Sequence, residues 1–212
     1  MYAQAIARAF TSFKNKIDNI PLEIPTLLYA NNHWENSKML TPLQVGIFSN
    51  GWQNINPIEH ENLKAFAPWF NTISKTNTDN ASVSFKFKGS AFGFFDIGGP
   101  EVGQVLIEVD GNCVELTRKA GNVSNVVPNE TSFKCLNNRF NSFCNNRYRG
   151  QFELFEVADG VHEVKISLSN LIADKMSILK GQDIEDITNN PYKYNQRTFY
   201  LGKILIKGDV LK

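Results

Sequence analysis

The chain has 212 residues, of which 42% are hydrophobic and 20% are charged, so it holds enough apolar material for a sizeable core. Its 22 basic and 21 acidic side chains leave a net charge of +1, which argues against nucleic acid or an anionic membrane surface as the main partner. No segment approaches the roughly 20 consecutive apolar residues that would span a bilayer, so we expect no membrane span.

Residues 1–18 carry the strongest helical pattern of the chain. Large apolar side chains recur at steps of three and four residues, alanines between them add helix propensity, and Pro21 follows the expected end of the helix. Such an apolar stripe needs a surface to bury against, either on the β domain that follows or in a preceding domain that is absent here. The stripe consists of Tyr2, Ile6, Phe10, Phe13 and Ile17.

Residues 21–80 are predicted to be mostly linker and loop with short strands. A strand is expected over residues 43–49, and an Asn-Gly turn follows it. Pro68 interrupts the apolar segment at residues 63–70, so we expect a helical turn there rather than a long helix.

Residues 82–111 have the most regular β pattern of the chain and are predicted to be the centre of the fold. Val83, Phe85 and Phe87 alternate with polar residues, as in a strand that is buried on one face. A turn at Gly89 is expected to separate this strand from a second, nearly continuous apolar strand. A Gly-Gly-Pro turn then precedes a third strand, which ends in an Asp-Gly hairpin turn.

The rest of the chain is predicted to complete an all-β domain. Residues 120–147 are rich in asparagine and weakly periodic, so we expect a long loop. Alternating patterns at residues 151–157 and 161–168 predict two strands joined by the Asp-Gly turn between them, and residues 199–206 predict a final strand. Many short strands with such turns are typical of a jelly-roll-like antiparallel β-sandwich, so the predicted class is mainly β with one N-terminal helix.

The three cysteines, Cys113, Cys135 and Cys144, match neither a disulfide framework nor a zinc site in their spacing. Two alternatives remain open on the sequence. In the first, all three thiols are free and buried or partly buried. In the second, an exported protein joins Cys135 to Cys144 and leaves Cys113 free.

Two segments resemble a known protein family. FKGSAFGFFDIGGPEVGQVLIEVDG at residues 87–111 and FNSFCNNRYRGQFELFEVADGVHEVKISL at residues 140–168 are similar to the two signatures of a β-sandwich domain attached to SGNH/GDSL-type hydrolases. Those hydrolases are esterases and deacylases that act on acylated sugars. Asn141 stands where that domain tends to have an aspartate.

The resemblance implies a domain arrangement and a partner. Residues 1–20 would be the closing helix of an upstream SGNH hydrolase domain, and residues 21–212 would be the β-sandwich domain. The family's Gly-Asp-Ser, Gly-x-Asn-Asp and Asp-x-x-His blocks are missing from the sequence, so no residue is carried over as nucleophile, oxyanion donor or base. An esterase of this kind would work in an extracellular, periplasmic or cell-surface location.

The residues themselves predict no catalytic site. His33, His60 and His162 are far apart in sequence, and no nucleophile elbow is present, so we expect the chain by itself to be non-catalytic. Asp96 follows a strand, where it either ligates a structural calcium ion or caps a turn. No other metal or cofactor is expected.

Carbohydrate is the partner class that the remaining residues favour. Sugar recognition uses aromatic faces flanked by amides and arginines. We therefore predict a non-catalytic carbohydrate-binding accessory domain of an SGNH-type esterase that acts on acylated glycans. In the alternative, the tryptophans belong to the core or to a domain seam, the arginines pair with acidic neighbours, and the chain packs on the hydrolase or mediates oligomerisation. The candidate ligand-binding residues are Trp52, Trp69, Asn141, Arg147, Tyr148 and Arg149, with Trp34 as a further aromatic candidate.

Overall fold

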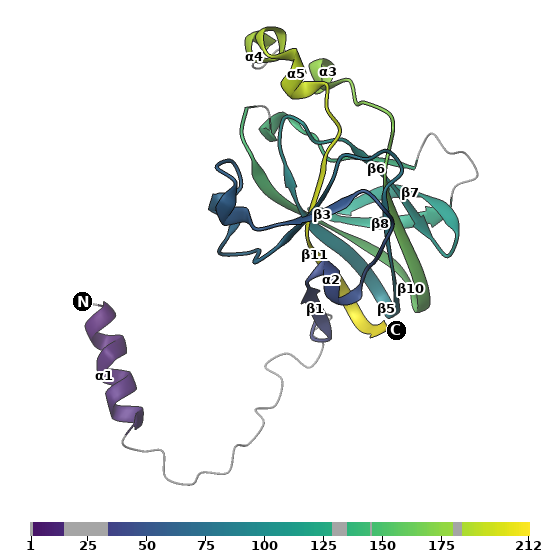
Figure 1. The fold of residues 1–212 in the computed structure, drawn as a ribbon. Coiled ribbons are helices and arrows are strands. Elements are labelled where there is room, and N and C mark those ends of the chain that lie inside the picture. Colours follow the sequence, from purple (N-terminus) through teal and green to yellow (C-terminus); the bar gives the residue numbers. More distant parts are fainter. Residues whose placement is uncertain (1, 15–33, 129–134, 145, 180–183) are drawn as a thin grey trace. The chain divides into compact units, whose positions relative to one another are not determined.

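The computed structural model describes residues 2–14, 34–128, 135–144, 146–179 and 184–212 (Figure 1). The chain divides into two compact units, Met1–His33 and Trp34–Lys212. In the first unit, helix α1 (Tyr2–Lys14) confirms the predicted helix over that range. The predicted end of this helix, with Ile17, lies outside the described residues.

Within the described residues of its own unit, the apolar stripe of α1 is exposed. Ile6, Phe10 and Phe13 are 57%, 72% and 65% exposed. None of the described helices is long and apolar enough to cross a membrane.

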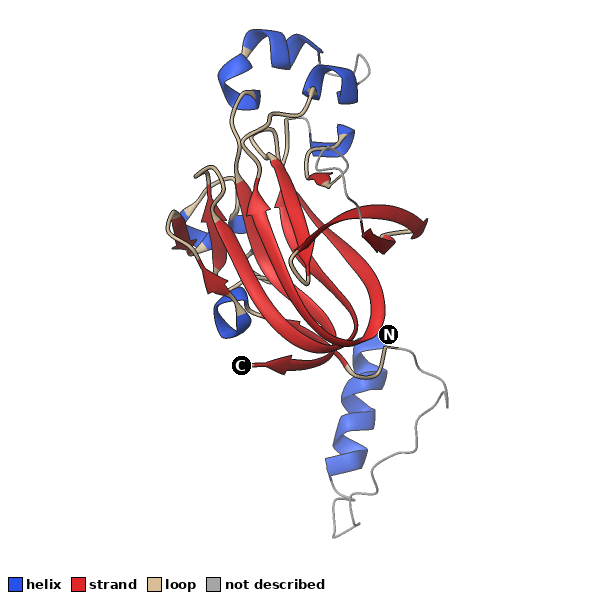
Figure 2. Ribbon diagram, turned by 90° about the vertical axis from the view of Figure 1, so that its right-hand side faces the viewer, coloured by secondary structure: helices blue, strands red, loops and turns tan. Residues whose placement is uncertain are grey.

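The second unit is a mostly antiparallel β-sheet whose strands follow the order β3-β4-β11-β5-β10-β8-β7-β6-β9. In addition, β1 pairs with β11, β2 with β5 and β6 with β10. The sheet curls over itself into a β-sandwich, as Figure 2 shows, so the predicted fold class is confirmed. The strands are β1 (Ser37–Leu40), β2 (Ile47–Phe48), β3 (Trp52–Ile55), β4 (Ile73–Thr76), β5 (Ser82–Gly98), β6 (Gln104–Val109), β7 (Asn112–Ala120), β8 (Val123–Pro128), β9 (Leu136–Asn138), β10 (Arg149–Leu168) and β11 (Phe199–Leu211).

Short helical segments connect the strands. The segment predicted as a strand over residues 43–49 instead forms α2 (Pro42–Val45) and the two-residue β2, because Pro42 begins a helical turn that a Thr-Gln capping box stabilises. The helical turn expected within residues 63–70 is confirmed as η2 (Lys64–Phe66). The others are η1 (Pro57–Glu59), η4 (Ser142–Cys144), α3 (Lys175–Leu179), α4 (Ile184–Asn189) and α5 (Pro191–Tyr194).

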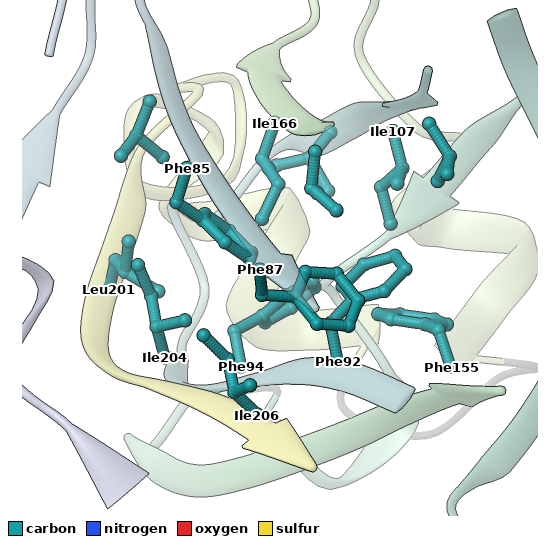
Figure 3. Close-up of a cluster of buried hydrophobic side chains, with 14 of the residues drawn as sticks. Phe85, Phe87, Phe92, Phe94, Ile107, Phe155, Ile166, Leu201, Ile204 and Ile206 are labelled. Atoms are coloured by element: carbon teal, nitrogen blue, oxygen red, sulfur yellow. The ribbon is translucent and has the colours of Figure 1, made fainter. Parts of the chain in front are cut away.

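The main core lies between the layers and is rich in phenylalanine (Figure 3). The predicted buried face of Val83, Phe85 and Phe87 is confirmed, since these side chains are 0–2% exposed. Phe92 of the same strand packs on Phe155 of β10, with ring centroids 5.1 Å apart. The core is completed by side chains of β6, β10 and β11, including Ile107, Ile166, Leu201, Ile204 and Ile206.

Two predicted turns are wrong because the glycines involved form bends within long strands. β5 runs through Gly89 without a break, and β10 runs through Asp159 and Gly160. Both halves of β10 pair with β5, and the register shifts between Glu156 and Gly160, where Gly160 lies opposite Gly89. A glycine marks a bulge as readily as a turn, and here continuous pairing on both sides produces the bulge.

The long loop predicted for residues 120–147 is also wrong. It contains β8, which pairs antiparallel with β7 and parallel with β10, then β9 on the edge beside β6, and η4. These strands are held by pairing across the sheet, which a weak local pattern does not reveal.

The cysteine pairing differs from both alternatives drawn from the sequence. Cys113 of β7 forms a disulfide with Cys135, which precedes β9, and Cys144 is a buried free thiol. The disulfide is possible because the fold brings the Cα atoms of two residues that are 22 positions apart to within 5.9 Å. It ties the β7–β8 ribbon to the segment that leads into β9.

Candidate ligand-binding groove

An open groove of about 610 Å³ lies where β10 begins. Its wall comes from the first five residues of β10, from β9 with the segment that follows it, and from the turn between β7 and β8. Amide side chains and arginines dominate the lining, with two phenylalanines. The lining residues are Gly121, Asn122, Ser124, Leu136, Asn137, Asn138, Arg139, Asn141, Phe143, Arg149, Gly150, Gln151, Phe152 and Glu153.

The floor of the groove is an ion network centred on Arg139. Its Nε and Nη2 donate to the two carboxylate oxygens of Asp96 at 3.0 and 2.8 Å, and its Nη1 donates to Glu153 at 2.7 Å. The Asn137 amide donates to Glu153 at 3.1 Å and accepts from Arg139 at 2.7 Å. Arg139 also lies over the Phe94 ring, 4.8 Å from its centroid. Asp96 points to this side because it follows Phe94 by two residues along β5, and such residues share a face.

Burial makes this network structural. Asp96 is fully buried and Arg139 is 5% exposed. Burial disfavours the charged form of Arg139, but Asp96 and Glu153 outweigh it and raise the pKa of Arg139 above its ordinary value. The guanidinium therefore stays charged, and its donors are used inside the floor rather than offered to a ligand.

A second set of hydrogen bonds fixes the segment above the floor. Gln151 donates to Asp96 at 3.0 Å and to the Arg139 carbonyl at 2.9 Å, and it accepts from Asn141 at 2.9 Å. Asn141 in turn accepts from the backbone N–H of Phe143 at 2.9 Å, which starts η4. The floor thus holds the backbone at Phe143 in place.

The rim carries the groups that a ligand can reach. Phe143 is 58% exposed. Phe152 is 46% exposed, but its ring packs on Phe95 and so lies on the face that carries Trp69, opposite to Arg149. The Arg149 guanidinium lies over the Phe143 ring, 4.9 Å from its centroid, and among the described residues it has no ion-pair partner. Exposed aromatic faces beside a cation and several amides can bind a ligand that is apolar on one face and rich in hydroxyls at its edge.

The structure brings only some of the predicted site residues together. Asn141 and Arg149 line the groove. Arg147 is exposed and donates to the Phe143 carbonyl at 3.1 Å, so it borders the same segment. Their role in binding stays a prediction.

The predicted aromatic residues lie elsewhere. Trp52 packs edge-on against Phe48 and Phe199 and donates to the Ser82 carbonyl at 3.0 Å, as in the core alternative. Trp69 is 56% exposed and packs on Phe95, on the face of the β5–β10 pair opposite to Arg149.

Tyr148 also lies outside the groove. Its hydroxyl donates to Glu101 at 2.7 Å, and that carboxylate accepts a second bond, of 2.8 Å, from Tyr200. Burial and the Glu101 charge raise the pKa of Tyr148 above its ordinary value. The hydroxyl is thus a permanent donor within a packed cluster.

Phe143 was missed because an aromatic residue in a strand or turn predicts a core position unless its neighbours are known. The signal available for Phe143 was its position in the Asn-rich segment beside Asn141.

Asp96 and its acidic neighbour Glu153 are both paired with Arg139. Both oxygens of Asp96 accept hydrogen bonds from Arg139 or Gln151. Within the described ranges, no group of three or more His, Cys, Asp and Glu side chains is placed to hold a metal ion. The calcium hypothesis thus remains an expectation from the sequence alone.

No protein-family profile matches the chain, and no curated protein matches it. Solved structures with similar folds include a two-domain esterase (CEX) active on acetylated mannans, at 12% identity and a TM-score of 0.46 over 99% of this chain and 47% of that chain. Another is the CBM36-1 domain of a multidomain xylanase from the hindgut metagenome of Trinervitermes trinervoides, at 8% identity and a TM-score of 0.42 over 83% of this chain and 100% of that domain.

A third similar structure is a carbohydrate-binding module of Cellvibrio mixtus lichenase 5A in complex with cellotriose. It has 9% identity and a TM-score of 0.38 over 80% of this chain and 96% of the module. The present chain spans less than half the length of the two-domain esterase.

Proposed function

We propose that this chain is a non-catalytic carbohydrate-binding domain and that its ligand lies in the groove at the start of β10. The observation that carries the proposal is the pairing of the exposed Phe143 ring with the Arg149 guanidinium beside an amide-lined groove of about 610 Å³. A pyranose ring has an apolar face that suits Phe143 and hydroxyls that suit Arg149 and the amides. The groove is open rather than enclosed, so it suits a glycan chain better than a small molecule that needs an enclosed pocket.

A more specific form of the proposal concerns an upstream hydrolase domain. On the resemblance of residues 87–111 and 140–168, the domain serves an upstream SGNH-type esterase and holds an acylated glycan near its catalytic site. The β-sandwich contributes binding, and the hydrolase contributes the chemistry.

The test is a glycan array followed by calorimetry of the glycans that bind. We expect Phe143→Ala and Arg149→Ala each to weaken binding by roughly tenfold or more, because each removes a contact to the ligand's ring or hydroxyls. Tyr192→Ala is the matched control, since Tyr192 is a 69% exposed aromatic on α5 that does not line the groove. Absence of binding to every glycan, or equal loss in all three variants, would refute the proposal.

A second candidate function rests on α1. The exposed stripe of Ile6, Phe10 and Phe13 favours a helix that packs on another protein surface, here the upstream hydrolase. Phe10→Asp should then abolish co-purification of the chain with a separately expressed hydrolase domain and leave glycan binding unchanged. Co-purification at the wild-type level would exclude this use of the helix.

A further inference from the structure

A second hollow lies at the bend of the β5–β10 pair. It has a volume of about 280 Å³ and shares no lining residue with the groove. It forms where β5, β10 and β11 all change direction next to one another. Its lining is Asn36, Lys88, Gly89, Ser90, Asp159, Lys207, Gly208 and Asp209.

Two glycines make room for this hollow. A Cβ at Gly89 would lie 1.9 Å from the Lys207 carbonyl oxygen, and one at Gly208 would lie 2.1 Å from the Lys88 carbonyl oxygen. Gly208 also has a φ of +133°, which side chains with a Cβ rarely adopt. The backbones of β5 and β11 therefore touch at this point, and the flanking charged side chains frame a space that no side chain fills.

The lining of the hollow carries two lysines and two aspartates. Asp209 pairs with Lys38 at 2.5 Å, which leaves Lys88, Lys207 and Asp159 around the opening. In the part of the chain that the structure describes, neither Lys88 nor Lys207 has an ion-pair partner, although Lys88 is near enough to Asp209 to lower its pKa further. Two ammonium groups thus face one space.

An aromatic face adjoins these ammonium groups. The Lys207 Nζ lies 5.5 Å from the centre of the Trp34 ring, and Trp34 is 40% exposed. A ligand that reaches Lys207 can therefore also contact an indole. Asn36 and Ser90 add hydrogen-bonding side chains on the same lining.

We propose that this hollow is a second glycan site that binds a carboxylated sugar residue, a hexuronate. Lys88 and Lys207 take the carboxylate, the exposed part of Trp34 contacts the ring, and the polar lining groups bind hydroxyls. The combination of a cation pair with an aromatic face suits an acidic sugar better than a neutral sugar, which leaves both ammonium groups unmatched, or an inorganic anion, which leaves the indole unused. The site does not depend on the groove proposed above.

The test follows backbone amide NMR signals of the isotope-labelled chain during titration with trigalacturonate, and in a parallel series with triglucuronate. We expect the shifts to concentrate at residues 88–90, 159–160 and 207–209. In Lys88→Gln/Lys207→Gln the affinity should fall roughly tenfold or more, whereas Arg149→Ala in the groove should leave it unchanged. The methyl ester of trigalacturonate, which lacks the charge, should bind weakly in the wild-type chain.

Three results would overturn the proposal. The uronates could cause no shifts at the bend, the methyl ester could bind as tightly as the acid, or sodium sulfate at equal concentration could produce the same shifts. Loss of uronate binding in Arg149→Ala but not in the lysine variant would assign the uronate to the groove instead. Thermal unfolding of the lysine variant shows whether the sandwich is intact, and glycan-array binding through the groove is scored separately.

Discussion

The groove and the bend both involve strands β5 and β10, but they differ in how their charged side chains are paired. In the groove, Asp96, Arg139 and Glu153 are joined by hydrogen bonds of 2.7–3.0 Å beneath the surface. At the bend, Lys88 and Lys207 border an open hollow. The two regions thus differ in pairing: Asp96 and Arg139 are buried and paired, whereas Lys88 and Lys207 have no ion-pair partner among the described residues.

Burial explains the difference. A buried charge must be paired, since its transfer out of water costs several kcal/mol, and the paired groups then have few donors left. A ligand in the groove, as proposed above, would therefore contact the rim at Arg149 and Phe143, whereas a ligand at the bend would contact Lys88 and Lys207 directly. The predictions below test the two regions against each other.

Removal of Asp96 should have the largest effect. Asp96→Ala leaves the buried Arg139 guanidinium with two of its four hydrogen bonds, and we expect a loss of about 3–5 kcal/mol in the free energy of unfolding. Urea denaturation followed by circular dichroism measures it. At the bend, Asp209→Ala removes an exposed partner of Lys38 and should barely move the midpoint.

A double variant separates the lost pair from the lost packing. Asp96→Ala/Arg139→Met removes both charges, so it should be more stable than Asp96→Ala alone. If Asp96→Ala costs no more than Asp209→Ala, the floor of the groove is not a buried ion network and the comparison fails.

Loss of the Cys113–Cys135 disulfide should have the second-largest effect on stability. Of the two proposed sites, it should affect only the groove. The bond closes a loop with a sequence separation of 22 and leads into β9, which contributes Asn137 and Asn138 to the groove. We expect reduction to cost about 2–4 kcal/mol of stability and to weaken glycan binding in the groove. Uronate binding at the bend should change little.

The control for reduction is the chain without the bond. Cys113→Ala/Cys135→Ala should already show the weaker binding, and reductant should change it no further. An effect of reductant on that variant would point to Cys144 or to another cause.

Gly89→Ala should disturb the bend and spare the groove. The new Cβ would lie 1.9 Å from the Lys207 carbonyl oxygen, so the two backbones must separate, at a cost of about 1–3 kcal/mol. Gly160→Ala is the matched control, because Gly160 faces Gly89 across the pair but has only ordinary contacts at 3.6 Å or more. Melting temperatures of the two variants should therefore differ, and equal values would remove the close approach as the reason for the glycine.

The outcome at these glycines shows how far the sequence could predict the fold. The alternation of Val83, Phe85 and Phe87 identified the buried face because burial has a local signature. The sequence predicts turns at Gly89 and Gly160 because bulges and turns use the same residues, and only the partner strand distinguishes them. The pairing of Cys113 with Cys135 likewise depends on β7 and β9 lying near each other, which spacing does not encode.

The candidate site was predictable to a smaller extent. The sequence predicts Asn141 and Arg149 as site residues from their Asn- and Arg-rich segment, and both line the groove. Trp52 carries the same residue-level signal as an exposed platform, yet Phe48 and Phe199 surround it. The exposure of an aromatic ring is a property of its neighbours in space, so sequence alone could not separate Trp52 from Phe143.

The smallest predicted effect is a pH dependence of stability. It arises at His162, whose two ring contacts beside the bend we call the latch. His162 Nδ1 lies 2.8 Å from the Asp110 carboxylate, and Nε2 lies 2.8 Å from the Ala158 carbonyl oxygen. Both contacts call for an N–H, so the imidazolium form satisfies them together. The latch connects the β6–β7 turn to the bulge that holds Asp159. Asp159 also acts on the ring electrostatically, and the neighbouring Glu163 is paired with Lys86.

The sign of the pH effect follows from the two pKa shifts. Burial lowers the pKa of His162, but the bonds to Asp110 and Ala158 outweigh it and raise the pKa above its ordinary value of 6.5. This stabilisation is fully present below about pH 6.5 and is lost as pH rises through the raised pKa. Burial raises the pKa of Asp110, but bonds from Glu163 and His162 outweigh it and hold the pKa below 3.8, so that contribution is lost only as pH falls through the lowered pKa.

The latch should therefore stabilise the chain most between about pH 4 and pH 6.5. Between about pH 6 and pH 8.5, the melting temperature of the wild-type chain should fall by a few degrees more than that of His162→Gln, which cannot titrate there. His60→Gln, at an exposed histidine outside these contacts, is the control substitution. Parallel slopes for wild type and His162→Gln would mean that the bend gains nothing from the charge on His162, and only its lysines would then distinguish it electrostatically from the groove.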